Sequence, residues 1–109
     1  MKRLFAITAI LCASHANAAF WDGNTLYKNL QEQPNMTLGA AYGFIMGVHD
    51  LGEHVIHCSP EGTKAKDVIE VVREFLQYNA SDRNKEAQEL VSSALKFKWP
   101  CKKKTGLPI

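Results

Sequence analysis

The sequence has no apolar run long enough to cross a membrane. Its two most apolar segments, Leu4–Ala13 and Leu38–Val48, reach about half of the roughly 20 residues that a membrane-spanning helix needs. No segment alternates apolar and polar residues as a half-buried strand does, and no internal repeat is present. A glycine-rich phosphate loop, a nucleophile-elbow pattern and a zinc-enzyme signature are missing as well. These absences favour a small helical protein that binds a partner over an enzyme.

What the N-terminus does contain is the pattern of an export signal. Lys2 and Arg3 precede the apolar run Leu4–Ala13, and Ala16-Asn17-Ala18 supplies the small residues that signal peptidase recognises. Cys12 follows a leucine rather than a small residue, so a lipoprotein signal is not expected. We predict that residues 1–18 form a cleaved signal peptide and that the mature protein is periplasmic.

Without residues 1–18 the formal charges balance. Two of the 13 basic residues lie in the signal, so the remaining basic residues equal the 11 acidic residues in number. Residues 19–95 nevertheless hold 6 basic and 11 acidic side chains, because lysines crowd the C-terminus. We expect an acidic helical domain over residues 19–101 and a solvated basic tail over residues 102–109. Contact of this tail with a membrane is not favoured, and no nucleic-acid partner is expected.

Cysteine is scarce, with three residues in the whole chain. Cys12 leaves with the signal, so the mature chain keeps Cys58 and Cys101. An even number of cysteines in an exported protein predicts a disulfide. Closing the loop between these two positions contributes about 4 kcal/mol in the chain-entropy model. That is a large share of the stability of about 5–15 kcal/mol that is typical of a domain.

Apolar periodicity and capping residues predict four helices and therefore an all-α fold, a small bundle with one disulfide. Pro34 ends the first helix, and Trp99-Pro100-Cys101 ends the last one. The predicted helices are Asn24 to about Gln33, Asn35 or Thr37 to about His57, Thr63 to the break at Asn79–Asp82, and Ser81 or Asp82 to about Trp99, each beginning at its capping residue.

Three glycines recur every four residues in the second predicted helix. Gly39, Gly43 and Gly47 form one smooth stripe along it. Each glycine weakens a helix by about 1 kcal/mol, so three in register indicate that another backbone packs closely there. We expect this contact in the core of the domain or in a dimer.

The only dense group of metal-ligand side chains is His49, Asp50, Glu53, His54 and His57. On a helix that continues to His57, all of them except His49 share one face. Two imidazoles and a carboxylate suit zinc or copper, which makes His54 and His57 weak metal candidates, and three histidines also suit a pH sensor. The spacing is ordinary, so a solvated helix end is favoured and no cofactor is expected.

An ordered set of short motifs spreads over residues 20–101 and includes both mature cysteines. The motifs are Asp22-Gly23-Asn24-x-Leu26, Tyr42 with Gly47-Val48-x-Asp50, Cys58-x-Pro60, Val71-Val72-x-x-Phe75-Leu76, Asp82-Arg83-x-x-x-x-Ala87, Leu90-Val91-x-x-Ala94-Leu95 and Trp99-Pro100-Cys101. This set resembles the Rap/Tai immunity proteins, which protect bacteria from amidases delivered by type VI secretion. The resemblance implies an all-helical periplasmic protein with a Cys58–Cys101 bridge, often dimeric. Its implied partner is a peptidoglycan-cleaving amidase with a cysteine–histidine active site, neutralised by plugging of its cleft.

Inhibition of this kind requires a protruding loop rather than catalytic residues. The candidate contacts lie in two turns, and they are Ser59, Pro60, Glu61 and Gly62 in the first, and Asp82 and Arg83 with the nearby Tyr78 in the second. For any one of these residues, a purely connecting role is the simpler interpretation. The main alternative function is that of a periplasmic stress protein such as an acid-activated chaperone. A metal-binding protein that uses His54 and His57 is a third hypothesis.

Overall fold

The computed structural model describes residues 20–32 and 34–102. The predicted signal peptide and residues 103–109 of the basic tail therefore lie outside the described residues. The elements in chain order are α1 (Gly23–Leu30), α2 (Met36–Gly52), α3 (Ala65–Tyr78), the short 3₁₀-helix η2 (Ala80–Asp82) and α4 (Ala87–Lys98). The described part of the chain contains isolated bridges but no strand, so the all-α prediction is confirmed. None of its helices is long and apolar enough to cross a membrane.

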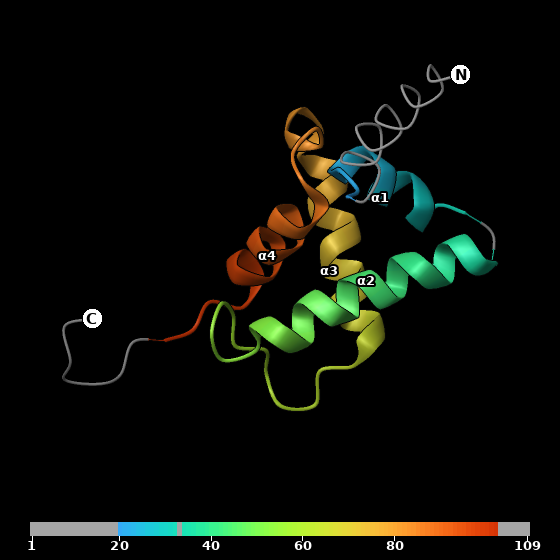
Figure 1. Cartoon of the computed structure of the whole chain (residues 1–109). Helices are drawn as coiled ribbons and strands as arrows, with labels where there is room; N and C mark the ends of the chain where they lie inside the picture. The colour runs from blue at the N-terminus through green and yellow to red at the C-terminus, as the bar shows by residue number, and fades with distance from the viewer. Residues whose placement is uncertain (1–19, 33, 103–109) are drawn as a thin grey trace, which may run out of the picture.

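The four helices pack around one core to which each contributes. In Figure 1, α2 crosses α3, while α4 lies against both and α1 closes one end. The 3.6-residue periodicity of α3 and α4 turns their apolar residues inward, as expected for amphipathic helices. The core consists of Leu26, Leu30, Ala41, Ile45, Val68, Ile69, Val72, Leu76, Ala87, Leu90, Val91, Ala94 and Leu95.

Helix α2 is the most apolar of the four and yet buries few of its side chains. Only Ala41, Ile45 and Gly52 are buried in it. Several large apolar side chains stay in contact with water instead, with Met36 88 % exposed and Leu51 86 % exposed. Much of the apolar surface of α2 is therefore available to a partner.

Two helix starts follow from side-chain caps. The Asp22 carboxylate accepts a hydrogen bond from the Thr25 N–H at 2.8 Å, so Asp22, rather than the predicted Asn24, caps α1. Asn35 caps α2 by accepting from the Leu38 N–H at 3.0 Å, which confirms one of the two predicted caps.

The predicted caps of the third and fourth helices are wrong. The Thr63 hydroxyl donates to the Pro60 carbonyl at 2.6 Å, and α3 begins after Lys64, whose N–H donates to the Asp67 carboxylate at 2.9 Å. Ser81 and Asp82 form η2 rather than capping α4. Helix α4 starts only after Glu86.

Helix α2 ends at Gly52, five residues before the predicted end at His57. The chain turns back because the Gly52 carbonyl accepts from the Val55 and Ile56 N–H groups at 2.9 and 2.7 Å, and His54 adopts a left-handed φ of 68°. The imidazole of His57 then packs on Gly52, where an added Cβ would lie 3.3 Å from the ring. The absence of a side chain at Gly52 thus permits this reversal.

The predicted disulfide is present and links this reversal to the end of α4. Cys58 and Cys101 are joined with their Cα atoms 4.8 Å apart. Beside the bond, the Cys58 N–H donates to the Trp99 carbonyl at 2.8 Å. The segment after α2 is consequently fixed to α4 by a covalent bond and by a backbone hydrogen bond.

Candidate functional site

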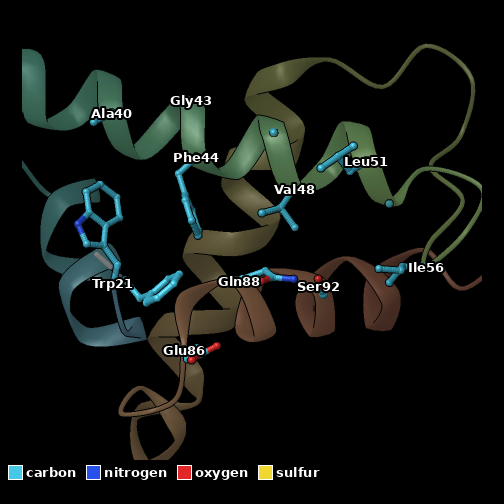
Figure 2. Close-up of a pocket in the computed structure, with 13 residues that line it drawn as sticks. Trp21, Ala40, Gly43, Phe44, Val48, Leu51, Ile56, Glu86, Gln88 and Ser92 are labelled. Carbon is cyan, nitrogen blue, oxygen red and sulfur yellow. The ribbon is translucent and has the colours of Figure 1, made fainter. Parts of the chain in front are cut away.

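An apolar groove of about 840 Å³ runs between α2 and α4. Figure 2 shows Phe44 and Val48 of α2 pointing toward Gln88 and Ser92 of α4, with Trp21 closing one end. The rings of Trp21 and Phe44 pack with their centroids 5.6 Å apart. The groove also takes in the exposed Leu51, so it offers a mostly apolar surface to another chain.

The glycine stripe of α2 does not pack on the core of this chain. Apart from the adjacent residues and the backbone of α2 itself, a Cβ added at Gly39, Gly43 or Gly47 would meet no atom of the described residues within 4 Å. Gly43 and Gly47 instead line the apolar groove. The stripe thus has no close-packed neighbour in this chain, and its packing against another backbone, as in a dimer, stays a prediction.

The turn Ser59–Thr63 projects from the domain between the disulfide and α3 (Figure 1). Its Pro60, Glu61 and Gly62 are all exposed. Gly62 adopts a φ of +89°, which a residue with a Cβ rarely reaches, and the Thr63 N–H closes the turn on the Pro60 carbonyl at 3.2 Å. The turn therefore has a defined shape despite its exposure.

The second candidate contact region, Asn79–Arg83, lies at the opposite end of α3. Tyr78 beside it is 72 % exposed. Arg83 is occupied within the chain, because it donates to the Leu76 carbonyl at 2.7 Å and to the Asn24 side chain at 3.2 Å. Its guanidinium also lies 4.3 Å from the ring centre of Tyr27. Arg83 therefore connects α1 to the end of α3, and roughly 20 Å of helix separates the two candidate regions.

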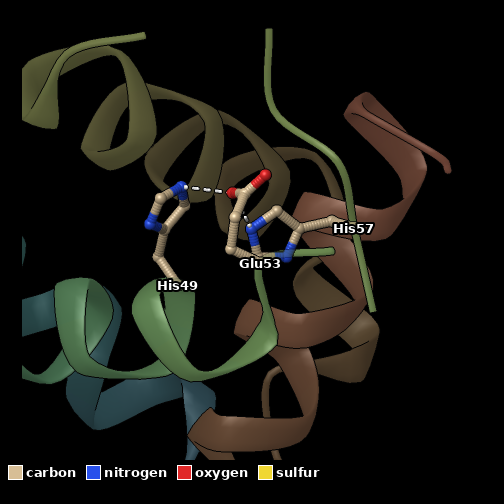
Figure 3. Close-up of side chains that lie close together, drawn as sticks. All are labelled: His49, Glu53 and His57. Carbon is tan, nitrogen blue, oxygen red and sulfur yellow. Dashed lines mark ion pairs between the residues drawn. The ribbon is translucent and has the colours of Figure 1, made fainter. Parts of the chain in front are cut away.

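The histidine-rich segment folds differently from the prediction. Because α2 ends at Gly52, the expected common face of Asp50, Glu53, His54 and His57 does not form. The side chain of His54 is 79 % exposed, with its Nδ1 3.8 Å from Glu53 Oε2. The residues that converge are His49, Glu53 and His57, shown in Figure 3. We call these three the His–Glu cluster.

Glu53 stands at the centre of the His–Glu cluster. Its Oε1 lies 3.3 Å from His49 Nε2 and 3.0 Å from His57 Nε2. It also accepts hydrogen bonds from the Ser59 N–H at 2.9 Å and from the Ser59 hydroxyl. Burial raises the pKa of the Glu53 carboxyl, but these hydrogen bonds and the two imidazoles outweigh it, so the pKa lies below its ordinary value. The carboxylate is thus held in its ionised form.

His57 is the buried member of the His–Glu cluster, with 1 % of its surface exposed. Burial lowers its pKa, and the nearby Glu53 carboxylate only partly opposes this effect. Neither of its ring nitrogens has a hydrogen-bond partner among the described residues, although Nε2 lies 3.0 Å from the Glu53 carboxylate. An imidazole buried without hydrogen-bond partners lowers the stability of the fold unless a bound ion or molecule satisfies its nitrogens.

Ser59, His49 and Asp50 have the connectivity of a hydrolase triad. His49 Nε2 lies 3.1 Å from the Ser59 hydroxyl, and its Nδ1 lies 3.1 Å from Asp50 Oδ1. The Ser59 hydroxyl donates to Glu53, however, so its proton is directed away from His49. This arrangement does not activate the serine as a nucleophile.

Sequence reasoning identified Glu53 and His57 and missed His49 as a member of the cluster. A signal was present, since His49, Glu53 and His57 follow one another at intervals of four residues. The first interval lies on α2, where such residues are neighbours. The second interval spans the reversal after Gly52, which the periodicity did not reveal.

A small helical domain closed by a disulfide, with an apolar groove and an exposed turn, defines a protein built for binding. The sequence model of the Rap1a immunity proteins matches residues 12–101. The chain therefore belongs to the family of Rap1a immunity proteins, which is not a family of enzymes. Membership implies that its partner is a cognate effector. No curated protein matches the chain.

Proposed function

We propose that the mature chain acts in the periplasm, where it binds a peptidoglycan-cleaving amidase delivered by type VI secretion and blocks its active site. The family match over residues 12–101 carries this proposal. The export pattern of residues 1–18 and the Cys58–Cys101 bond support the location, because disulfides persist in oxidising compartments such as the periplasm. The mechanism is occlusion, so this chain needs no catalytic group of its own.

The turn Ser59–Thr63 is the segment that we expect to enter the amidase cleft. It projects from the domain, and its base is held by the disulfide at Cys58 and by the hydrogen bonds from Ser59 to Glu53. A turn that is fixed before binding loses less conformational entropy when it is bound, which favours affinity. The exposed Glu61 adds a negative charge at the tip, and negative charge accelerates association with a basic partner.

The region at the other end of α3 serves as a separate contact in this proposal. Tyr78 is a suitable anchor, since exposed aromatic residues often dominate binding energy. Asp82 lies beside it, whereas Arg83 has a structural role within the chain. The apolar groove with its glycine stripe is the surface that we expect in a homodimer, the state implied by the family resemblance.

A protection assay in cells tests the function directly. The full chain is expressed with its own signal while members of a panel of type VI amidases are directed to the periplasm. We expect rescue from lysis by one amidase, and loss of rescue when residues 2–18 are deleted. Failure across the panel, with the protein shown to be exported and oxidised, would contradict the proposal. Protection of client proteins from aggregation at acid pH would then support the chaperone alternative.

A further inference from the structure

We propose that the His–Glu cluster binds a divalent transition-metal ion, with zinc as the best match, at the base of the turn Ser59–Thr63. Two imidazole nitrogens and one carboxylate oxygen are the ligands that zinc takes in open sites with a water molecule in the fourth position. Calcium and magnesium prefer sets of oxygen ligands alone. The inference goes beyond the immunity function and does not depend on it.

The positions of the three ligand atoms fit a site that closes slightly on binding. Ligand atoms around a tetrahedral zinc lie about 3.3–3.5 Å apart. The distances from Glu53 Oε1 to His49 Nε2 and to His57 Nε2 are 3.3 and 3.0 Å, and all three ligand atoms lie within 4.8 Å of one another. The two imidazole rings pack with their centroids 4.8 Å apart, and a shift of roughly 1 Å between them completes the geometry.

The orientation of His49 is that of a metal ligand. Its Nδ1 lies 3.1 Å from the Asp50 carboxylate, and a ring proton on Nδ1 that donates to this carboxylate would leave a lone pair on Nε2. Histidines that bind metals commonly donate their second ring N–H to a carboxylate in this way. The Nε2 lone pair then faces Glu53 Oε1 and the oxygen of Ser59, whose own proton is directed to Glu53. In this tautomer the Nε2 lone pair and the oxygens of Glu53 and Ser59 converge, which is the arrangement that a bound cation requires.

The state of His57 is the second, independent observation. Its imidazole is buried, and no described residue forms a hydrogen bond with either of its nitrogens. Buried polar groups are nearly always satisfied, and coordination of a metal by Nε2 would satisfy that nitrogen. The close contact with Gly52 holds the ring in place, so Nε2 points at Glu53 rather than into the apolar core.

Glu53 and the surface around it provide the remaining requirements of a metal site. The hydrogen bonds from Ser59 hold the carboxylate, as outer-shell partners do in metal proteins. A pocket of about 500 Å³ leads from solvent to His49 and Glu53 and gives an entry path. Neither lysine nor arginine lines this pocket, so no fixed positive charge opposes a cation.

The measurement uses the mature, oxidised chain without an affinity tag, freed of metal by a chelator. Zinc is titrated calorimetrically, and the melting temperature is recorded with and without zinc, with magnesium as the control ion. We expect one zinc per chain and a rise in Tm of about 10 °C or more when free zinc exceeds the Kd 100-fold. Magnesium should leave the Tm unchanged. Absence of a zinc-dependent shift would overturn the proposal.

Variants locate the site. His49→Ala and Glu53→Gln each remove a ligand, and we expect either to weaken zinc binding more than about 100-fold, while Asp50→Asn weakens it about 10-fold. The His49 side chain is partly exposed, whereas that of His57 is almost fully buried, so the ligand variants are made at His49 and Glu53 rather than at His57. His54→Asn is the matched control, because it removes a neighbouring imidazole and keeps a residue that tolerates the left-handed backbone. The assignment is wrong if zinc binds the His49 variant normally or if the His54 variant loses binding.

Discussion

Single residues at the ends of helices determine how the chain turns from one element to the next. Asp22 and Gly52 illustrate two ways of doing so. Asp22 supplies an acceptor to a helix that has unpaired N–H groups, whereas Gly52 acts through the absence of atoms. Substitution of either residue should therefore change the stability of the fold in a defined way.

Removal of the Asp22 cap should destabilise α1 in a pH-dependent way. The backbone N–H of Thr25 holds the pKa of Asp22 below its usual value. Asp22→Ala should cost about 1 kcal/mol of the free energy of unfolding near neutral pH. Because the pKa is lower in the folded state, this contribution is full above about pH 4 and is lost as the pH falls through the folded pKa.

Urea unfolding of the wild type and of Asp22→Ala across pH 2–7 checks this prediction. Asp22→Asn is the control, since asparagine caps a helix as well as aspartate but does not titrate. It should stay close to the wild type at neutral pH. A gap between the wild type and the alanine variant that remains constant down to pH 2 would argue against the assigned cap.

Replacement of glycines in α2 by alanine should change the free energy of unfolding in opposite directions at different positions. Gly52→Ala forces a Cβ to 3.3 Å from the His57 ring and should destabilise by about 1–3 kcal/mol. Gly39→Ala meets nothing within 4 Å and should stabilise the monomer by up to about 1 kcal/mol, because alanine favours helix. Thermal unfolding of the two variants at low protein concentration distinguishes them. Equal effects would mean that the environments of these glycines are not as described.

At the scale of elements, the sequence predicts some helices much better than others. Helices α3 and α4 follow from their periodicity, because each has one buried and one solvated face. The end of α2 was missed because Gly52 resembles the three glycines that the helix tolerates, and because the exposed Val55 and Ile56 continue the apolar pattern. This error placed His54 in the candidate site and left out His49. Periodicity carries no information on a chain reversal that depends on one missing Cβ.

The turn between α2 and α3 should govern the rate of partner binding. Glu61→Lys reverses the charge at its tip and should slow association with a basic amidase, with a smaller effect at high salt, because the effect is electrostatic. Glu89→Lys makes the same charge change at an exposed position in the first turn of α4 and serves as the control. Stopped-flow association rates at low and high salt compare the two. Equal rates for both variants would remove the turn from the proposed interface.

At the scale of the whole molecule, the disulfide compensates for a small core. Replacement of Cys58 and Cys101 by serine should lower the free energy of unfolding by about 4 kcal/mol in the chain-entropy model. Denaturant titration of the double variant and of the oxidised wild type gives the difference. The reduced wild type should match the variant. A loss below about 1 kcal/mol would show that packing alone holds the turn Ser59–Thr63.

The same bond divides the domain into a ring and an arm. Residues 58–101 form a closed ring that contains α3 and α4, while α1 and α2 precede it and are held to it by packing and hydrogen bonds without a second covalent link. In amide hydrogen exchange, the arm should open more readily than the ring, since no cross-link restrains its N-terminal part. His49 and Glu53 belong to the arm, and His57 lies next to the ring at Cys58. A cation bound by these three residues would therefore tie α2 to the ring. It would limit the separation of α2 from α4 along the apolar groove.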